Sequence, residues 1–262
     1  MTALSHEQHA LMLAGAIAGV LALATLVGIT LKIKVAKGQP HGVIDNLNTR
    51  VSAWWVMAAL LGLALLAGRT GVVVLFAFAS FAALREFTTM GLERRFDPVT
   101  VLWGIVLCVL CVSHAPALLM LQIPGYEGRS AFLLLYLILV VQASDVLQYI
   151  WGKLAGRRKI APRLSPSKTV EGMVGGVLSA TVLGAALTPI TPFTPVQSAL
   201  ISLAIALLGF AGGLMLSAIK RSRGIKDWGT LIRGHGGVLD RLDSLCLSAP
   251  VFFYIVGLGW AA

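Results

Sequence analysis

Acidic residues near the end of the chain have the spacing of a magnesium site. Asp240 and Asp243 lie three residues apart, and Asp227 precedes them in the same polar stretch. Three residues is close to one helical turn, so Asp240 and Asp243 would share one face of a helix that begins there. Mg²⁺ prefers oxygen ligands and often takes only one or two protein carboxylates together with substrate phosphates. The spacing therefore predicts Mg²⁺ at Asp240, with Asp227 or Asp243 nearby.

The same stretch carries the positive charge that a polyphosphate substrate requires. Its candidate phosphate-binding cations are Lys220, Arg221, Arg223, Lys226 and Arg241. Glycines on both sides of His235 allow a ligand to approach the backbone closely, and their N–H groups before a helix could bind phosphate; they are Gly234, Gly236 and Gly237. This composition suits phosphoryl or nucleotidyl transfer. By residue types alone, a solvated basic loop with local Asp–Arg pairs explains it equally well.

A second polar segment, between two apolar runs, repeats this pattern. Asp145 lies near the end of the first run, and acidic residues inside membrane segments are candidates for function. Ser167 or Thr169 can cap the helix that follows, with Glu171 in its first turn. Lys168 at the same helix start is unfavourable for the helix dipole unless an anion binds there. The segment therefore predicts either a capped helix or an anion site.

Long apolar runs must position both polar stretches. The chain of 262 residues is 57% hydrophobic, with a mean hydropathy of +0.86, and a soluble core of this size cannot bury so much. A helix that crosses the hydrocarbon layer needs about 20 apolar residues. We predict an all-α polytopic membrane protein with eight spans, at residues 10–31, 51–67, 71–86, 99–120, 130–151, 170–189, 198–217 and 245–260. Spans one to four form an N-terminal region, 1–125, and spans five to eight a catalytic region, 126–262.

Basic residues gather on one side of these predicted spans. Nineteen of the 21 Lys and Arg residues fall in the loops after the first, third, fifth and seventh spans, and Arg69 and Arg129 are the exceptions. Because cytoplasmic loops are enriched in Lys and Arg, we place these four loops in the cytoplasm and both termini outside. This topology accounts for the net charge of +10 better than nucleic-acid binding, which we do not expect.

The run from Ser217 to Asp243 resembles the signature of the phosphatidate cytidylyltransferases, also called CDP-diacylglycerol synthases. It reads SAIKR-x4-KDWG-x2-I-x-GHGGVLDRLD. The segment Ser144–Gly172, which contains SPSKTVEG, is similar to the second motif region of that family. Together these segments cover about the last 120 residues, whereas the N-terminal half matches in hydropathy and in the pair Glu86-Phe87.

The resemblance implies a Mg²⁺-dependent reaction of CTP with phosphatidate that gives CDP-diacylglycerol and pyrophosphate. It implies metal ligands among Asp240, Asp227, Asp243 and Asp145, and catalytic roles for Lys168, Lys220, Arg221, Lys226, His235 and Arg241. Substrate contacts are expected from Ser165, Ser167, Thr169, Glu171, Ser217, Gly234, Gly236 and Gly237. The resemblance also implies a homodimer in the bacterial inner membrane, with the active site facing the cytoplasm. Gly15 and Gly19 form a GxxxG step that can pack helices closely.

Two positions depart from the family pattern. Gly213 stands in a Gly212-Gly213-Leu214 step where the family commonly has Asp, implied as a metal ligand. Arg233 replaces the proline that the family has before the glycines. We expect the first departure to weaken Mg²⁺ binding and reduce activity, and the second to change only loop stiffness and local charge.

Other functions are consistent with parts of this pattern. A catalytically weakened homologue could act as a membrane scaffold or regulatory partner, and a related enzyme could use another lipid phosphate, such as an isoprenoid one. A transporter fits less well, because it would need charged residues or broken helices near mid-membrane. Here the charged residues lie almost entirely in predicted loops or at helix ends.

Overall fold

The computed structural model describes residues 6–89, 98–232, 234 and 236–261, and these residues are mainly helical. Seven helical segments in this part of the chain are long and apolar enough to cross a membrane. They are α1 (His6–Lys34), α2 (Gly42–Leu66), α3 (Gly68–Thr89), the segment Pro98–Met120, α6 (Ser130–Leu154), α8 (Pro195–Ser222) and α9 (Leu239–Gly259). The predicted all-α, polytopic membrane class is confirmed.

The predicted span at 170–189 differs from the other seven. It corresponds to α7 (Val170–Ala186), a helix of 17 residues, followed by a short 3₁₀ turn, η4 (Thr188–Ile190). Seventeen residues extend about 25 Å at 1.5 Å per residue, less than a hydrocarbon layer of about 30 Å. Thr169 caps its first turn and Pro189 follows its last, so α7 is too short to count as a full span by itself.

The fourth predicted span is helical throughout but changes its winding. It consists of α4 (Pro98–Ile105), a π-helical segment η2 (Val106–Cys111), α5 (Val112–Ala117) and a 3₁₀ turn η3 (Leu118–Met120). Pro116 lies inside α5, and a proline removes one backbone hydrogen bond from a helix. The departure from regular α-helix therefore coincides with a residue that cannot continue the regular pattern.

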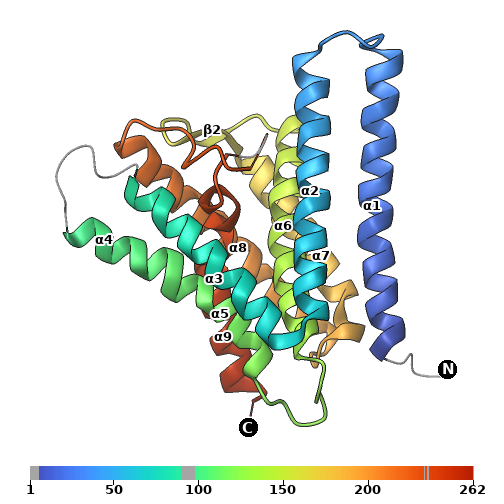
Figure 1. Ribbon diagram of the computed structural model, residues 1–262, viewed down its shortest axis with the longest axis vertical. Helices are drawn as coiled ribbons and strands as arrows, with labels where there is room; N and C mark the ends of the chain where they lie inside the picture. Colours follow the sequence, from blue (N-terminus) through green and yellow to red (C-terminus); the bar gives the residue numbers. More distant parts are fainter. Residues whose placement is uncertain (1–5, 90–97, 233, 235, 262) are drawn as a thin grey trace. The chain divides into compact units, whose positions relative to one another are not determined.

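The chain divides into two compact units. One comprises residues 1–75 and 230–236, and the other comprises residues 76–229 and 237–262. In the first unit α1 and α2 form an antiparallel helical hairpin (Figure 1). Trp55 Nε1 donates a hydrogen bond to Thr25 Oγ1 at 3.1 Å, which links the two helices within this unit. The predicted boundary at residue 125 falls inside the second unit.

The second unit holds the motif region 144–172 and most of the run 217–243, of which residues 230–236 belong to the first unit. In it α6 packs along α7, α7 packs on α8, and α8 packs on α9. Tyr136 of α6 is fully buried; its hydroxyl donates to the Ser198 carbonyl at 2.7 Å, and its ring stacks on Phe252 of α9 at 5.7 Å. This packing fixes α6, α8 and α9 against one another near one end of the unit.

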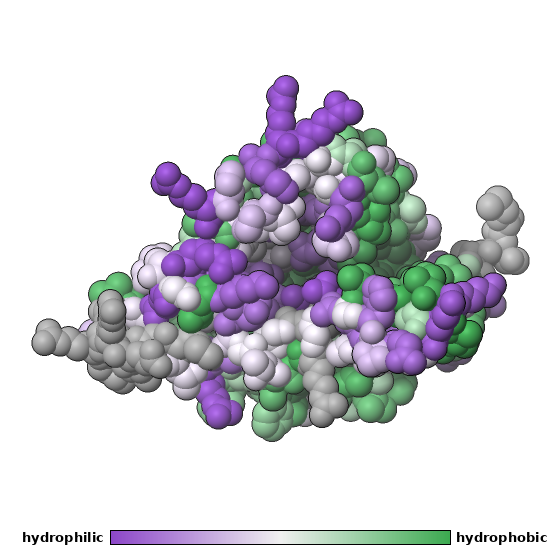
Figure 2. All heavy atoms as spheres, turned by 90° about the horizontal axis from the view of Figure 1, so that it is seen from above, coloured by the Kyte–Doolittle hydropathy of each residue, from purple (hydrophilic) through white to green (hydrophobic). Residues whose placement is uncertain are grey.

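A small β-hairpin connects α6 to α7 where the sequence predicted a polar loop. Strands β1 (Lys159–Ala161) and β2 (Ser165–Thr169) pair antiparallel, with Lys159 opposite Thr169. Figure 2 views the end of the molecule at which this hairpin lies and shows hydrophilic side chains gathered there, several of them projecting outward. The exposed basic side chains of this connection are Lys153, Arg157, Arg158, Lys159 and Arg163. Their exposure fits their predicted role in membrane topology.

Candidate active site

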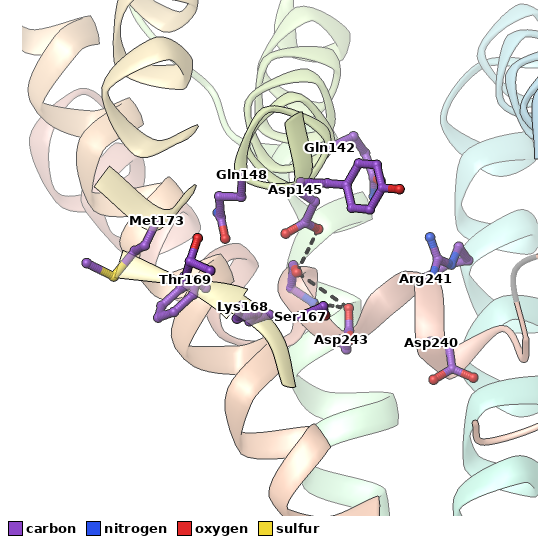
Figure 3. Close-up of a pocket in the computed structure, with 13 residues that line it drawn as sticks. Gln142, Asp145, Gln148, Ser167, Lys168, Thr169, Met173, Asp240, Arg241 and Asp243 are labelled. Carbon is purple, nitrogen blue, oxygen red and sulfur yellow. Dashed lines mark hydrogen bonds between the residues drawn. The ribbon is translucent and has the colours of Figure 1, made fainter. Parts of the chain in front are cut away.

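A polar pocket lies in the second unit, between β2, the middle and C-terminal half of α6, the middle of α8 and the first turns of α7 and α9 (Figure 3). The cavity has a volume of about 210 Å³ and carries side chains of both charges. Its walls come from α6, β2, the start of α7, α8 and the start of α9. The lining residues are Gln142, Asp145, Gln148, Tyr149, Ser167, Lys168, Thr169, Met173, Phe210, Asp240, Arg241, Asp243 and Ser244.

Two carboxylates in this pocket are held by one serine. The Ser244 hydroxyl donates to Asp145 Oδ2 at 2.8 Å, and the Ser244 backbone N–H donates to Asp243 Oδ1 at 2.8 Å (Figure 3). Asp145 comes from α6 and Asp243 from the first turns of α9, so Ser244 joins two elements about 100 residues apart in the sequence. Asp145 Oδ1 and Asp243 Oδ2 have no hydrogen bond to any residue that the structure describes.

Lys168 extends from β2 into the same pocket. Its Nζ lies 4.6 Å from the centre of the Phe210 ring, a cation–π distance. Burial lowers the pKa of Lys168, although the charges of Asp145 and Asp243 oppose that effect. The pocket thus combines two carboxylates with a buried ammonium group.

Gly213 explains how Lys168 fits there. A Cβ atom at Gly213 would lie 3.0 Å from Lys168 Nζ, 3.6 Å from Ser244 Oγ and 3.9 Å from Asp243 Oδ2. The position where the family pattern has Asp therefore faces this same group of polar atoms. In this chain the ammonium of Lys168 lies next to that position instead.

Asp240 has a different environment, although it is one turn from Asp243. It is 5% exposed, and its Oδ1 accepts from Lys220 Nζ at 2.7 Å. Its Oδ2 accepts from the backbone N–H groups of Trp228 at 2.8 Å and Gly237 at 2.9 Å. Both oxygens are therefore occupied, and Asp240 anchors the loop before α9 to α8.

Glu86 of α3 caps the N-terminus of α9. Its two carboxylate oxygens accept from the N–H groups of Val238 and Leu239, both at 2.9 Å. A side chain at Gly237 would collide with the Glu86 carboxylate, so this contact requires glycine there. Phe87, the next residue, stacks on the buried Trp228 ring at 5.1 Å. Sequence reasoning did not foresee that Glu86 caps α9 or that Phe87 packs on Trp228.

These contacts restrict the predicted phosphate-binding glycines. The N–H groups of Gly237 and of the first residues of α9 are already bound to carboxylates. Gly234 and Gly236 belong to the first unit, where their carbonyls accept from Arg50 Nε and the Ile232 N–H. The predictions on His235 and Arg233 lie outside the described residues.

The other predicted residues divide between the pocket and its surroundings. Ser167, Thr169 and Arg241 line the pocket, and Thr169 Oγ1 caps α7 by accepting from the Gly172 N–H at 3.1 Å, as the sequence predicted. The remaining predicted residues outside the lining are Ser165, Glu171, Ser217, Lys220, Arg221, Lys226 and Asp227.

Several of these outer residues have identified structural contacts. Glu171 accepts from the backbone N–H groups of Arg157 and Arg158 and so fixes the turn into the hairpin. Ser217 Oγ donates to the Gly213 carbonyl at 2.6 Å, and Arg221 donates to the Leu164 carbonyl at 3.1 Å. These contacts support the walls of the site from outside the pocket.

Sequence reasoning missed the other polar residues of α6. Gln142 and Gln148 lie three residues before and after Asp145, Tyr149 lies four residues after it, and all four line one side of the pocket. Such spacing puts side chains on one helix face. Two amides and one acid on a single face of an apolar span therefore could have indicated from the sequence that this face lines a polar site.

The donor set fits a metal ion that shares its coordination with a substrate. Asp145 and Asp243 each keep one carboxylate oxygen free of hydrogen bonds to described residues, and both face the pocket. Among those residues no set of three His, Cys, Asp or Glu side chains forms a complete metal site. Mg²⁺ commonly takes one or two carboxylates and completes its shell with water and phosphate oxygens. The residues present fit that kind of ion.

Comparison with known proteins places the chain. The model of the "Cytidylyltransferase family" matches residues 96–258. The chain belongs to the cytidylyltransferase family. The matched range contains every residue that lines the pocket. This confirms the resemblance found in the sequence and makes the chain a nucleotidyltransferase of lipid metabolism.

Individual relatives agree with this assignment. An uncharacterised Escherichia coli protein, YnbB, is 33% identical over 80% of this chain and 87% of its own length. A phosphatidate cytidylyltransferase of Rickettsia bellii is 30% identical over 86% of this chain and 98% of its own. The Haemophilus influenzae phosphatidate cytidylyltransferase is 41% identical, but over 49% of this chain and 46% of its own length.

Proposed function

We propose that this cytidylyltransferase transfers CMP from CTP to phosphatidate and so makes CDP-diacylglycerol and pyrophosphate. The observation that carries the proposal is the pocket in which Asp145 and Asp243, joined by Ser244, face Lys168. It lies within the family match, and relatives that share this region are named phosphatidate cytidylyltransferases. Nucleotidyl transfer needs a site for a cation beside one for phosphate, and the pocket offers both kinds of group.

Each charged group then has a definable task. Asp145 and Asp243 would hold Mg²⁺, which when bound neutralises charge on the triphosphate. Lys168 and Arg241 supply positive charge for phosphate oxygens. The buried Arg241 Nε has no hydrogen-bond partner among the described residues, and an unpaired buried donor is costly. An anionic substrate would satisfy that donor.

The chemistry requires no nucleophile from the protein. A phosphate oxygen of phosphatidate attacks the α-phosphorus of CTP, a new P–O bond forms, and the bond to the β-phosphate oxygen breaks. Pyrophosphate leaves with the bonding electrons, and Lys168 and Arg241 stabilise its charge. The protein therefore contributes orientation and electrostatic stabilisation.

The surroundings suit a substrate whose tail stays in the membrane. The walls of the pocket belong mainly to apolar helices, and the hairpin that contributes β2 to it exposes basic side chains. The excess of Lys and Arg in alternate loops favours a cytoplasmic location for this end. We accordingly propose an inner-membrane enzyme that draws CTP from the cytoplasm. A homodimer is also proposed; Gly15 and Gly19 have open space where a Cβ would lie, so a second helix can approach there.

The test is turnover by the full chain in phospholipid nanodiscs. The assay supplies Mg²⁺, radiolabelled CTP and phosphatidate and measures CDP-diacylglycerol. We expect Asp145→Asn to lower turnover by about 10²–10³-fold, since metal binding contributes several kcal/mol and each 1.36 kcal/mol is tenfold. Glu127→Gln likewise converts a carboxylate to an amide, at an exposed position outside the pocket, and should retain activity.

Two results would contradict the proposal. Absence of turnover with phosphatidate, while an isoprenoid phosphate gives a cytidylylated product, would assign a different lipid substrate. Equal losses in Asp145→Asn and Glu127→Gln would show that the described pocket is not where the reaction occurs.

A further inference from the structure

Lys168 is placed as a cation inside a carboxylate centre. Its Nζ lies against the Phe210 ring at 4.6 Å and 3.0 Å from where a Gly213 side chain would begin. Asp243 Oδ2 lies 3.9 Å from that same point. The ammonium and this carboxylate therefore face each other across the space that Gly213 leaves open.

Lys168 nevertheless does not bond directly to either acid. Among the residues that the structure describes, the side-chain ion pairs within 4.0 Å are Lys32–Asp45 and Lys220–Asp240. The charges of Asp145 and Asp243 are still close enough to favour the protonated form of Lys168. Lys168 thus balances the two acids at short range without occupying their free oxygens.

We propose that Lys168 is the resident counter-cation of Asp145 and Asp243, that it competes with the first divalent cation, and that it moves to the nucleotide phosphates when CTP binds. The proposal rests on the proposed function for its nucleotide step. Its metal step rests on the described geometry.

The physical reason is that two acids bound by the same serine in one partly buried pocket need positive charge nearby. Before substrate binds, Lys168 supplies that charge. A divalent cation entering between the acids meets a like charge, which weakens its binding. Once a triphosphate brings its own negative charge, Lys168 gains a partner, and the same charge favours the complex. Its contact with Phe210 is a weak, non-directional one, so the flexible side chain can turn toward the phosphates.

The experiment measures Mn²⁺ binding to the full chain in phosphatidylcholine nanodiscs by electron paramagnetic resonance. The variants are Lys168→Met, which removes the charge, and Lys168→Arg, which keeps it. Lys159→Met is the matched control, because it removes an exposed lysine from the same hairpin. Each protein is titrated with Mn²⁺ alone and again with CTP present but no phosphatidate, so that no turnover occurs.

We expect Lys168→Met to bind Mn²⁺ alone about tenfold more tightly, because a like charge at this range shifts binding equilibria by about one to three logarithmic units. With CTP present, Lys168→Met should instead bind Mn²⁺ and the nucleotide more weakly than the unmodified protein, by about tenfold for the nucleotide. Lys168→Arg and Lys159→Met should follow the unmodified protein with Mn²⁺ alone. A purely structural role for Lys168 would not reverse sign between the two titrations.

An unchanged or weaker Mn²⁺ affinity in Lys168→Met would overturn the proposal, as would an equal gain in Lys159→Met. If Lys168→Met does not fold, Lys168→Gln provides the same charge change with a polar side chain. Tighter Mn²⁺ binding in a protein that makes no CDP-diacylglycerol would support the metal step while contradicting the proposed function. If the unmodified protein makes CDP-diacylglycerol but Lys168→Met leaves Mn²⁺ affinity unchanged, the proposed function is supported and the metal step is contradicted.

Discussion

Two acid–lysine groups lie one helical turn apart at the start of α9, and they differ in how completely they are satisfied. Asp240 forms a direct ion pair with Lys220 at 2.7 Å and accepts two backbone N–H groups. Asp243 and Asp145 share Ser244 and keep free oxygens that face a cavity. Both carboxylate oxygens of Asp240 therefore accept hydrogen bonds, whereas Asp145 and Asp243 each keep one oxygen without a bond to a described residue.

The difference teaches that residue type and spacing do not separate an anchoring acid from a binding acid. Asp240 holds the loop before α9 on α8, and Glu86 caps the same helix end from α3. These contacts fix α9 at its N-terminus. Asp243, one turn further on, is thereby held toward α6 and the pocket. If the proposed function holds, the anchoring group positions the two acids that would hold the metal.

Breaking the anchoring ion pair should have the largest effect. Lys220→Met leaves the buried Asp240 charge without its partner, and such a change costs about 3–5 kcal/mol. We expect a marked fall in melting temperature and loss of activity together, as followed by thermal unfolding in detergent. Exposed Lys226 on the same loop is the control, and Lys226→Met should melt like the unmodified protein. A stable Lys220→Met protein would show that the ion pair does not hold α9.

The same substitution at the two acids should sharpen the comparison. Asp243→Asn should lower turnover by about 10²–10³-fold and leave the melting temperature nearly unchanged, because it removes a buried negative charge near Asp145. Asp240→Asn, in contrast, should lower the melting temperature, because Lys220 loses its charged partner. Measuring both quantities for both variants tests this. Identical profiles would mean that the two acids do not have separate roles.

Ser244 should have a smaller effect that appears in the metal requirement. Ser244→Ala removes the hydroxyl bond to Asp145, and loss of such an orienting contact typically costs about 10–100-fold in metal affinity. We expect the Mg²⁺ concentration for half-maximal activity to rise by that factor, with activity restored at high Mg²⁺. Ser248→Ala removes a buried hydroxyl one turn further along α9, where it contacts only backbone carbonyls. An equal change in Ser248→Ala would assign the effect to general packing.

The sequence predicted the class of fold and the two segments that form the site. Long apolar runs are sufficient to predict the spans. In lipid a helix is favoured because it forms all its backbone hydrogen bonds within itself. The cap at Thr169 and the candidacy of Asp145 also followed from local rules. The β-hairpin did not, because the polar segment from Gly152 to Thr169 carries no alternating apolar pattern.

The roles of individual acids could not be predicted, because they depend on contacts between distant segments. Asp240 and Asp243 are equivalent in spacing, and only the approach of Lys220 from α8 and of Asp145 from α6 distinguishes them. Glu86 is more than 150 residues from the N–H groups that it caps. Such pairings arise from helix packing, which a single sequence does not reveal.

Gly213 offers the finest test of the comparison, because it lies between Lys168 and Asp243. Gly213→Ala adds a Cβ 3.0 Å from Lys168 Nζ, which is the mobile end of a long side chain, so a small shift relieves the contact. We expect less than about a threefold change in Mn²⁺ affinity, since the added methyl group changes no charge and supplies no metal ligand. Gly213→Asp adds a carboxylate that attracts Lys168 and adds oxygen ligands near Asp243, so Mn²⁺ should bind more tightly than in Gly213→Ala. If both variants bind Mn²⁺ equally, Gly213 serves helix packing alone, and the charge balance of the pocket does not depend on the missing acid.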